Sequence, residues 1–221
     1  MINIENYTKK LIDLLKDNFT SRFLYLGLQG SYLRNEATEN SDVDIMVIID
    51  DLSVSDLKLY RSLIESLGDF DKSCGFICSK NDLINWNPLE ICNLINSTKD
   101  YYGKLCDFTP SYNSDDVKNF IKFSLNNIYH EICHRYIHGN SENNVNNLPF
   151  TYKGVFFILQ NLHYLKTGRF KKTKAELLKE LENKDKLILE KSIEINKSSE
   201  YNFEESFNLI FTWCQETLSS L

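Results

Sequence analysis

The sequence lacks several features that would place it in a specialised class of protein. It has no long apolar run, because stretches such as residues 154–159 are far shorter than the roughly 20 apolar residues that a membrane helix needs. It also lacks an excess of basic residues, since Lys and Arg total 25 against 31 Asp and Glu, and the net charge is −6. A protein that binds nucleic acid through its overall field needs a basic stripe. We therefore expect neither a membrane nor a nucleic acid as a partner.

Paired cysteine spacings and internal repeats are absent from the given sequence as well, and we expect no leader sequence. The six cysteines are scattered through apolar segments, at Cys74, Cys78, Cys92, Cys106, Cys133 and Cys214. The simplest expectation is a cytoplasmic protein with reduced thiols. What the chain does have is a hydrophobic fraction of 42%, which is enough for the core of one large domain or two small ones.

The clearest chemistry in the chain begins with a strand that ends at a small-residue turn. Residues 23–29 are apolar and rich in aromatic side chains, which predicts a strand. Gly30 and Ser31 follow it directly. Because glycine has no Cβ, a phosphate can come close to the backbone there, and the serine adds a hydroxyl and a backbone N–H.

A pair of aspartates opens the next predicted strand after a polar loop. Asp42 and Asp44 flank the start of an apolar run over residues 43–49. The period of two in a strand places both aspartates on one face and the apolar side chains on the buried face. Two carboxylates that close together repel each other unless a hard cation lies between them, and Mg²⁺ fits one or two carboxylates plus phosphate oxygens. The alternative is a pair of aspartates that only cap the strand.

At these residues the chain resembles the DNA polymerase β-type nucleotidyltransferases, whose signature is Gly-Ser, a spacer and then Asp-x-Asp on a strand. Gly30, Ser31, Asp42 and Asp44 match that signature in order and in their flanking strands. Chain length and a helical second half look most like the small antibiotic, kanamycin-type members. The resemblance implies Mg²⁺-dependent transfer of a nucleoside monophosphate from an NTP, with ATP first, to a hydroxyl of a small molecule, with release of pyrophosphate.

A third strand is predicted over residues 70–78, and it contains a candidate for a third metal ligand. Alternation places Asp71 and Gly75 on one face of this strand. If that face joins the face with Asp42 and Asp44, Asp71 is the candidate ligand. The family pattern, however, has its third acid further along this strand. An ordinary turn aspartate is the alternative interpretation of Asp71.

The sequence predicts an α+β fold with two domains. Residues 1–110 are expected to form a nucleotidyltransferase domain with a mixed sheet and flanking helices, and residues 111–221 an antiparallel helical bundle. The predicted helices of the first part cover residues 4–18, a segment from Ser53 or Ser55 to Leu67 that Gly68 ends, and a short helix within 81–96. Five helices are predicted in the second part. The first covers residues 115–138, and the second is introduced by Pro149 and Thr151 and ends at Thr167. Thr173 and Glu176 cap the third, residues 185–196 form the fourth, and the fifth begins at Asn202.

One motif in the helical half competes with this interpretation. His130, Glu131 and His134 form a literal H-E-x-x-H match, and His138 follows one turn later. On a helix this pattern is typical of zinc hydrolases. In kanamycin-type enzymes, by resemblance, a glutamate from an early helix of the second domain takes the proton from the acceptor hydroxyl, and Glu131 is similarly placed. A solvated surface glutamate is the simpler alternative.

A group of basic residues follows the second predicted helix of the bundle. Its members are Lys166, Arg169, Lys171, Lys172 and Lys174. By resemblance to the antibiotic nucleotidyltransferases, Lys174 at the start of a helix is the candidate that contacts the triphosphate. The alternative is that these basic residues only form a charged, solvated surface of the protein. The alternatives left open are a protein-modifying, antitoxin-like nucleotidyltransferase, the zinc hydrolase, and a homodimer in place of a monomer.

Overall fold

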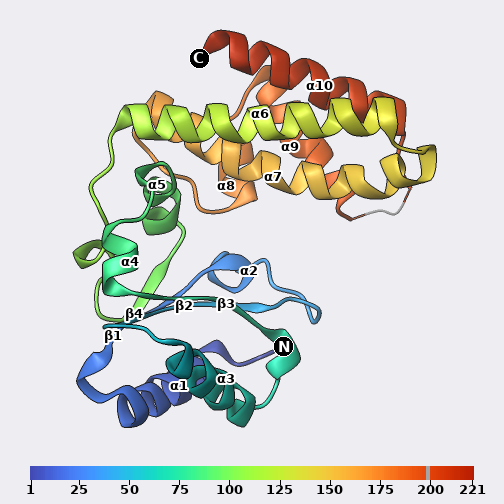
Figure 1. Ribbon diagram of the computed structural model, residues 1–221. Helices are drawn as coiled ribbons and strands as arrows, with labels where there is room; N and C mark the ends of the chain where they lie inside the picture. The colour runs from blue at the N-terminus through green and yellow to red at the C-terminus, as the bar shows by residue number, and fades with distance from the viewer. Residues whose placement is uncertain (198–199) are drawn as a thin grey trace. The chain divides into compact units, whose positions relative to one another are not determined.

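The computed structural model describes residues 1–197 and 200–221 and contains two compact units. The first unit comprises Met1–Ser111 and the second comprises Tyr112–Leu221. The described strands all lie in the first unit, and the second unit is helical (Figure 1). This is the α+β fold class that the sequence predicts. Among the described residues, no helix is both long enough and apolar enough to cross a membrane.

A four-stranded mixed sheet forms the centre of the first unit. Its strands are β1 (Phe23–Leu28), β2 (Val43–Ile49), β3 (Ser73–Ser79) and β4 (Lys99–Tyr102), in the order β3-β2-β1-β4. Strand β1 runs antiparallel to both of its neighbours, while β2 and β3 are parallel. The bounds of β2 are those predicted from its alternation.

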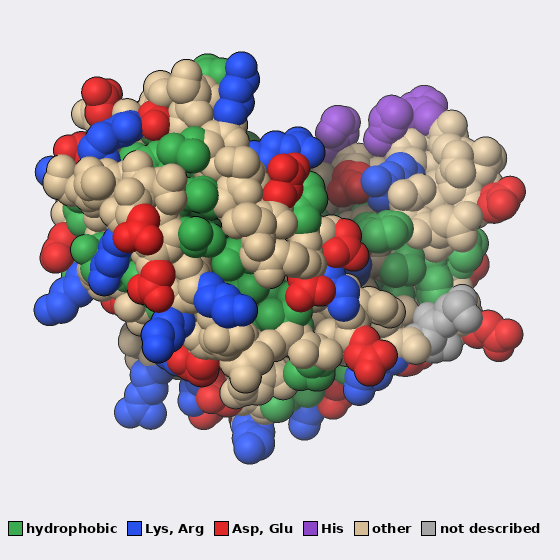
Figure 2. Space-filling model, turned by 90° about the horizontal axis from the view of Figure 1, so that it is seen from below, with side chains coloured by type: hydrophobic (Ala, Val, Ile, Leu, Met, Phe, Trp, Pro, Cys, Tyr) green, Lys and Arg blue, Asp and Glu red, His purple; other side chains and the backbone are tan. Residues whose placement is uncertain are grey.

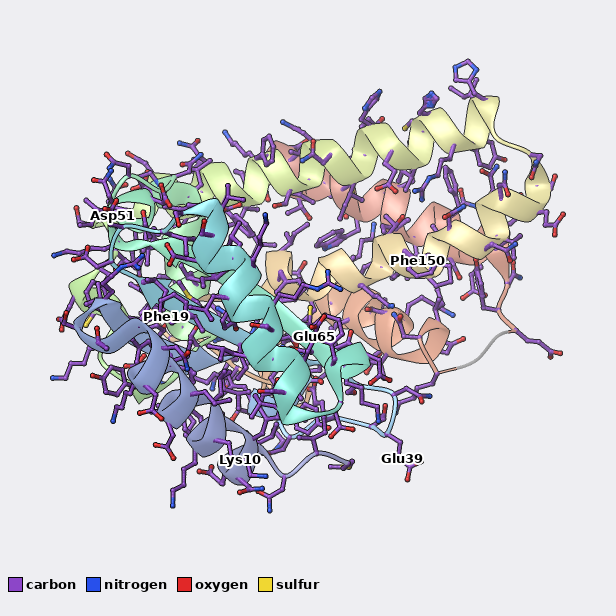
Figure 3. All side chains as sticks on the ribbon, turned by 60° about the horizontal axis from the view of Figure 1, so that its bottom comes forward. Lys10, Phe19, Glu39, Asp51, Glu65 and Phe150 are labelled. Carbon is purple, nitrogen blue, oxygen red and sulfur yellow. The ribbon has the colours of Figure 1, made fainter. Side chains whose placement is uncertain are left out.

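Two helices cover one face of this sheet. They are α1 (Ile4–Phe19) and α3 (Val54–Leu67), which lie side by side (Figure 1 and Figure 3). Their apolar residues share a core with the alternate residues of β2 that begin at Val43. Burial of these side chains drives the packing, at about 25 cal/mol per Å² of apolar surface. The other face of the sheet packs a smaller cluster around Met46 and Ile48.

Short elements complete the first unit. They are the helices α2 (Gly30–Leu33), α4 (Lys80–Ile84) and α5 (Pro88–Asn96), and the 3₁₀ helices η1 (Thr20–Arg22), η2 (Phe70–Lys72) and η3 (Leu105–Asp107). The single helix predicted within residues 81–96 is thus two helices, because Pro88 starts α5 anew with Asn87 as its N-cap. Strand β4 was not predicted, since its Lys-Asp-Tyr-Tyr sequence has no apolar alternation.

The third strand begins later than predicted. Gly68 and Asp69 both have positive φ, at 80° and 52°, so the chain turns sharply where α3 ends. The Lys72 N–H then donates to the Asp69 carbonyl at 2.9 Å and closes a 3₁₀ turn over Phe70–Lys72. Residues 70–72 belong to this turn and not to the strand, and β3 starts at Ser73. The prediction that Asp71 lies on the strand is therefore wrong.

The second unit is a helical bundle. Its helices are α6 (Ser114–His138), α7 (Ser141–Thr167), α8 (Lys174–Leu178), α9 (Asn183–Ile195) and α10 (Phe203–Ser220). Helices α6, α7, α9 and α10 pack against one another, and α8 packs on α9. The capping box predicted at Thr173 is confirmed, since Thr173 Oγ1 accepts from the Glu176 N–H at 3.1 Å while Glu176 Oε2 accepts from the Thr173 N–H at 3.1 Å.

Helix α7 corrects a prediction made from proline. Pro149 was expected to introduce a helix, but it lies inside one that begins at Ser141. Proline has no N–H, so the Val145 carbonyl one turn earlier loses its helical donor. The Tyr201 hydroxyl donates to that carbonyl instead. A side chain more than 50 residues away in the sequence thus compensates for the proline inside the helix. Phe150, which follows Pro149, is labelled on this helix in Figure 3.

Candidate active site

The site is built where the end of β1 meets the start of β2. The Gln29 N–H donates to the Asp44 carbonyl at 2.8 Å, which fixes the two chain segments side by side. The next residue, Gly30, has φ of +68°, and a Cβ built on it would lie 1.8 Å from Asp44 Oδ2. The backbone of the turn therefore lies directly against the carboxylate of Asp44. No residue with a side chain fits this position, for reasons of both space and backbone conformation.

The two aspartates differ in their surroundings. Asp42 precedes β2 and is exposed, whereas Asp44 is half-buried on the strand. Burial raises the pKa of the Asp44 carboxyl above its ordinary value, and repulsion from Asp42 adds to the rise. The Cys74 thiol, which donates to Asp44, and the charge of Arg34 act in the opposite direction. A cation beside Asp44 would favour its charged form, as metals do for carboxylate ligands.

Sequence reasoning missed Cys74. The parallel register of β2 and β3 pairs Asp44 with Cys74 and Ile45 with Gly75. The thiol therefore stands beside Asp44 on the neighbouring strand, and burial together with Asp44 raises its pKa. Gly75, which was expected to share a face with the aspartates, instead approaches the backbone of Ile45, where a Cβ would lie 1.9 Å from the carbonyl oxygen.

Asp71, the candidate third ligand, does not lie on β3. It is an exposed residue of η2, two residues before β3 begins. Within the described parts of the chain, no three His, Cys, Asp or Glu side chains are grouped so that they could hold a metal ion together. The acids that the first unit offers at the turn are thus Asp42 and Asp44.

Arg34 is a second residue of the site that sequence reasoning missed. It ends the short helix α2 that starts at Gly30, and its N–H donates to the Gly30 carbonyl. Its guanidinium forms an ion pair with Glu36 at 3.0 Å and also acts on the charge of Asp44. The sequence could have indicated Arg34, because it lies in the loop that connects the Gly-Ser turn at the end of β1 to the aspartates at the start of β2.

The donor set at the turn matches what a magnesium–triphosphate unit requires. Mg²⁺ takes one or two protein carboxylates and fills its remaining positions with water and phosphate oxygens. Asp42 and Asp44 supply the carboxylates, and Ser31 supplies a hydroxyl next to Gly30, whose backbone lies against the Asp44 carboxylate. Two carboxylates without a third acid suffice for such a site, although Cys74 adds no hard oxygen ligand.

The other predicted site residues lie in the second unit. Glu131 is on α6, half-exposed, and forms an ion pair with Arg135 one turn later. Lys174 is the first residue of α8, and its Nζ lies 5.8 Å from the centre of the Phe156 ring. His130 and His134 are exposed on α6. The structure therefore brings Gly30, Ser31, Asp42 and Asp44 together in the first unit, which also contains Asp71 outside the strands, and places Glu131 and Lys174 in the second unit.

Comparisons with known proteins bear on this arrangement. Residues 9–99 match the family model described as Polymerase beta, Nucleotidyltransferase. A putative protein adenylyltransferase of Methanocaldococcus jannaschii is 39% identical over 64 residues, which is 29% of this chain, and the chain spans 62% of that relative's length.

Solved structures add a likeness of fold. The spectinomycin adenyltransferase AAD(9) from Enterococcus faecialis, solved with ATP and spectinomycin, aligns over 97% of this chain and 99% of its own, with a TM-score of 0.60 and 13% identity. A chain of a toxin-antitoxin complex with AMP-PNP aligns over 58% of this chain and 92% of its own, with 23% identity and a TM-score of 0.32. The family match over residues 9–99 includes the turn at Gly30 and the pair Asp42 and Asp44, so this part of the chain is similar to the nucleotidyltransferase domains of the DNA polymerase β type.

Proposed function

We propose that this protein transfers a nucleoside monophosphate from ATP to a hydroxyl group of a small molecule and releases pyrophosphate. The observation that carries the proposal is the contact between the Gly30 backbone and the Asp44 carboxylate, which joins the Gly-Ser turn to the acid pair. The family match over residues 9–99 supports the reaction type.

Each residue of the turn has a role in this proposal. Ser31 and the backbone at Gly30 bind the terminal phosphates of the nucleotide, and Arg34 adds positive charge near them. Asp42 and Asp44 hold Mg²⁺, which when bound neutralises the phosphate charge and orients the phosphates. The protein contributes mainly positioning and a fixed electrostatic environment, as in other phosphoryl transfers.

The reaction also needs a group that accepts a proton. The acceptor oxygen forms a bond to the α-phosphorus, the bond from that phosphorus to the bridging oxygen breaks, and pyrophosphate leaves. The hydroxyl proton passes to a base, for which we propose Glu131, with Arg135 holding its carboxylate in place through their ion pair. Lys174 is proposed to bind the triphosphate.

ATP and a small hydroxylated acceptor are the substrates that the comparisons favour. The solved structure that aligns over 97% of this chain is an adenyltransferase with ATP and spectinomycin. We therefore propose an antibiotic such as spectinomycin as the first acceptor to test, and an aminoglycoside panel after it.

A polypeptide acceptor is the second candidate. It is favoured by the 39% identity over 64 residues to a putative protein adenylyltransferase. The two candidates differ in where the label from α-³²P-ATP appears. Label on spectinomycin or another small molecule supports the first, and label on polypeptide supports the second.

The decisive experiment compares Asp44→Asn with Asp13→Asn, a matched change at an exposed aspartate of α1. We expect Asp44→Asn to abolish the Mg²⁺-dependent stabilisation by ATP in thermal melts and to lower turnover on the order of 100-fold or more. Asp13→Asn should behave as the wild type in both assays. Wild-type protein that shows no Mg²⁺-dependent binding of any NTP would refute the proposal.

A further inference from the structure

Three histidines form a row along the exposed side of α6. His130, His134 and His138 are spaced four residues apart, and all three are exposed. Residues at this spacing lie on one face of a helix, each about one turn from the next. Figure 2 shows histidine side chains gathered together on the surface. The proposed nucleotidyl transfer uses none of them.

The distances between the rings suit metal chelation. The ring centroids of His134 and His138 lie 5.0 Å apart, and those of His130 and His134 lie 6.0 Å apart. With Zn–N bonds of about 2.0–2.1 Å in tetrahedral geometry, two imidazoles on one ion have ring centroids about 5 Å apart. The His134–His138 pair already has this separation.

The pair His134 and His138 differs from the motif of a zinc hydrolase. In that class a glutamate between the two histidines acts as the general base. The three residues between His134 and His138 include no glutamate. Since no group of three His, Cys, Asp or Glu side chains in the described parts of the chain is placed to hold a metal ion, a two-histidine site is the arrangement to consider.

We propose that His134 and His138 form a surface site for a borderline divalent transition metal ion, Zn²⁺, Ni²⁺ or Cu²⁺, with water in the remaining positions. Neutral imidazole suits these ions, whereas Mg²⁺ takes oxygen ligands. The site is therefore chemically separate from the proposed magnesium site at Asp42 and Asp44, and its test does not depend on nucleotide transfer.

The test titrates the full-length protein with Cu²⁺ and with Zn²⁺ in saturating Mg²⁺ and without nucleotide. Equilibrium dialysis measures affinity, and the paramagnetic resonance spectrum of the Cu²⁺ complex reports nitrogen ligands through hyperfine coupling. The variants are His134→Ala, His138→Ala and, as the matched control, His130→Ala. All three positions are exposed on a helix, where alanine is a favourable residue, so the fold should persist.

We expect the wild type to bind one ion of either metal with nitrogen coupling in the Cu²⁺ spectrum. Because even outer-shell partners of a metal ligand are worth about 10–100-fold in affinity, His134→Ala and His138→Ala should each weaken binding by at least about tenfold. His130→Ala should stay within about twofold of the wild type. Binding that is unchanged in His134→Ala, absent from the wild type, without nitrogen coupling, or lost equally in His130→Ala and His138→Ala would overturn the assignment.

Discussion

Gly30 controls both the backbone and the chemistry of the candidate site. Its φ of +68° is a conformation that residues with side chains rarely adopt. Gly168, which ends α7, has the same φ of +68°, but a Cβ there would meet nothing within 4 Å. Substitution of Gly168 therefore tests the backbone conformation alone, whereas substitution of Gly30 tests the conformation together with the contact to Asp44.

We predict that Gly30→Ala is more harmful than Gly168→Ala. Gly168→Ala should lower the free energy of unfolding by about 1 kcal/mol, because of the conformation alone. Gly30→Ala should cost more than that, because its methyl group displaces the Asp44 carboxylate, and it should abolish Mg²⁺-dependent ATP binding. Urea denaturation and calorimetric titration measure the two effects. Equal destabilisation with ATP binding retained in Gly30→Ala would contradict this account of the turn.

The neighbours of Gly30 show which site residues the sequence could predict. Gly30 and Asp44 belong to consecutive elements, strand, turn and strand, so their order alone indicated that they meet. Cys74 depends on the register between parallel strands, which nothing in its local sequence records. A one-residue shift in where β3 starts would turn a different side chain towards Asp44. Asp71 was placed on the strand because its local sequence does not show that residues 70–72 form a 3₁₀ turn.

The start of helix α3 depends on the charge of Asp56. Asp56 accepts from the Ser53 N–H at 2.8 Å and from Arg22 Nη2 at 2.7 Å, so it joins the capping box of α3 to an ion pair. These donors, with Arg22 first, hold the pKa of the Asp56 carboxyl well below its ordinary value. The folded protein therefore favours the charged form of Asp56 more strongly than the unfolded chain does.

We predict a pH-dependent effect of Asp56→Asn. An aspartate with a lowered pKa stabilises the fold fully above its unfolded value, about 3.9, and this stabilisation is lost as pH falls through the lowered value. Asp56→Asn should therefore lower Tm at pH 7, and its difference from the wild type should shrink towards pH 3. Asp17→Asn, at an exposed residue of α1, is the control and should show no such trend. A constant Tm difference from pH 7 to pH 3 would contradict the ion-pair explanation.

The Tyr201 hydroxyl donates to the Val145 carbonyl in place of the N–H that Pro149 lacks. Tyr201→Phe removes the hydroxyl that donates to the Val145 carbonyl and should cost about 1 kcal/mol in the free energy of unfolding. In a Pro149→Ala background the alanine N–H can donate to the same carbonyl, so the same change should cost less. Urea denaturation of the four proteins in this double-mutant cycle measures the coupling. No coupling would mean that Tyr201 does not compensate for the proline.

Helices with local end signals were predictable, and those that depend on distant partners were not. Gly68 and the capping residues Ser53 and Thr173 lie within a few residues of the ends they define, and their helices end or begin as expected. The continuation of α7 through Pro149 depends on Tyr201, which belongs to another part of the chain. No pattern around Pro149 contains that information.

At the scale of the whole molecule, charge determines which partners are attracted. The net charge of −6 gives no general field for a polyanion. We predict that the protein does not shift duplex DNA in a gel assay at physiological salt, at protein concentrations up to about 10 μM, because non-specific binding depends on phosphate neutralisation. A salt-dependent shift below that concentration would contradict the prediction.

The two outer strands of the sheet have a consequence for self-association. Strand β3 lies at one edge, and all seven of its residues pair with β2 in continuous register. Strand β4, at the other edge, has only four residues. An edge strand presents unpaired backbone groups that can pair with another chain, and β3 is the longer of the two edges. If two copies of this chain joined through their sheets, β3 is therefore the strand at which the second copy would add.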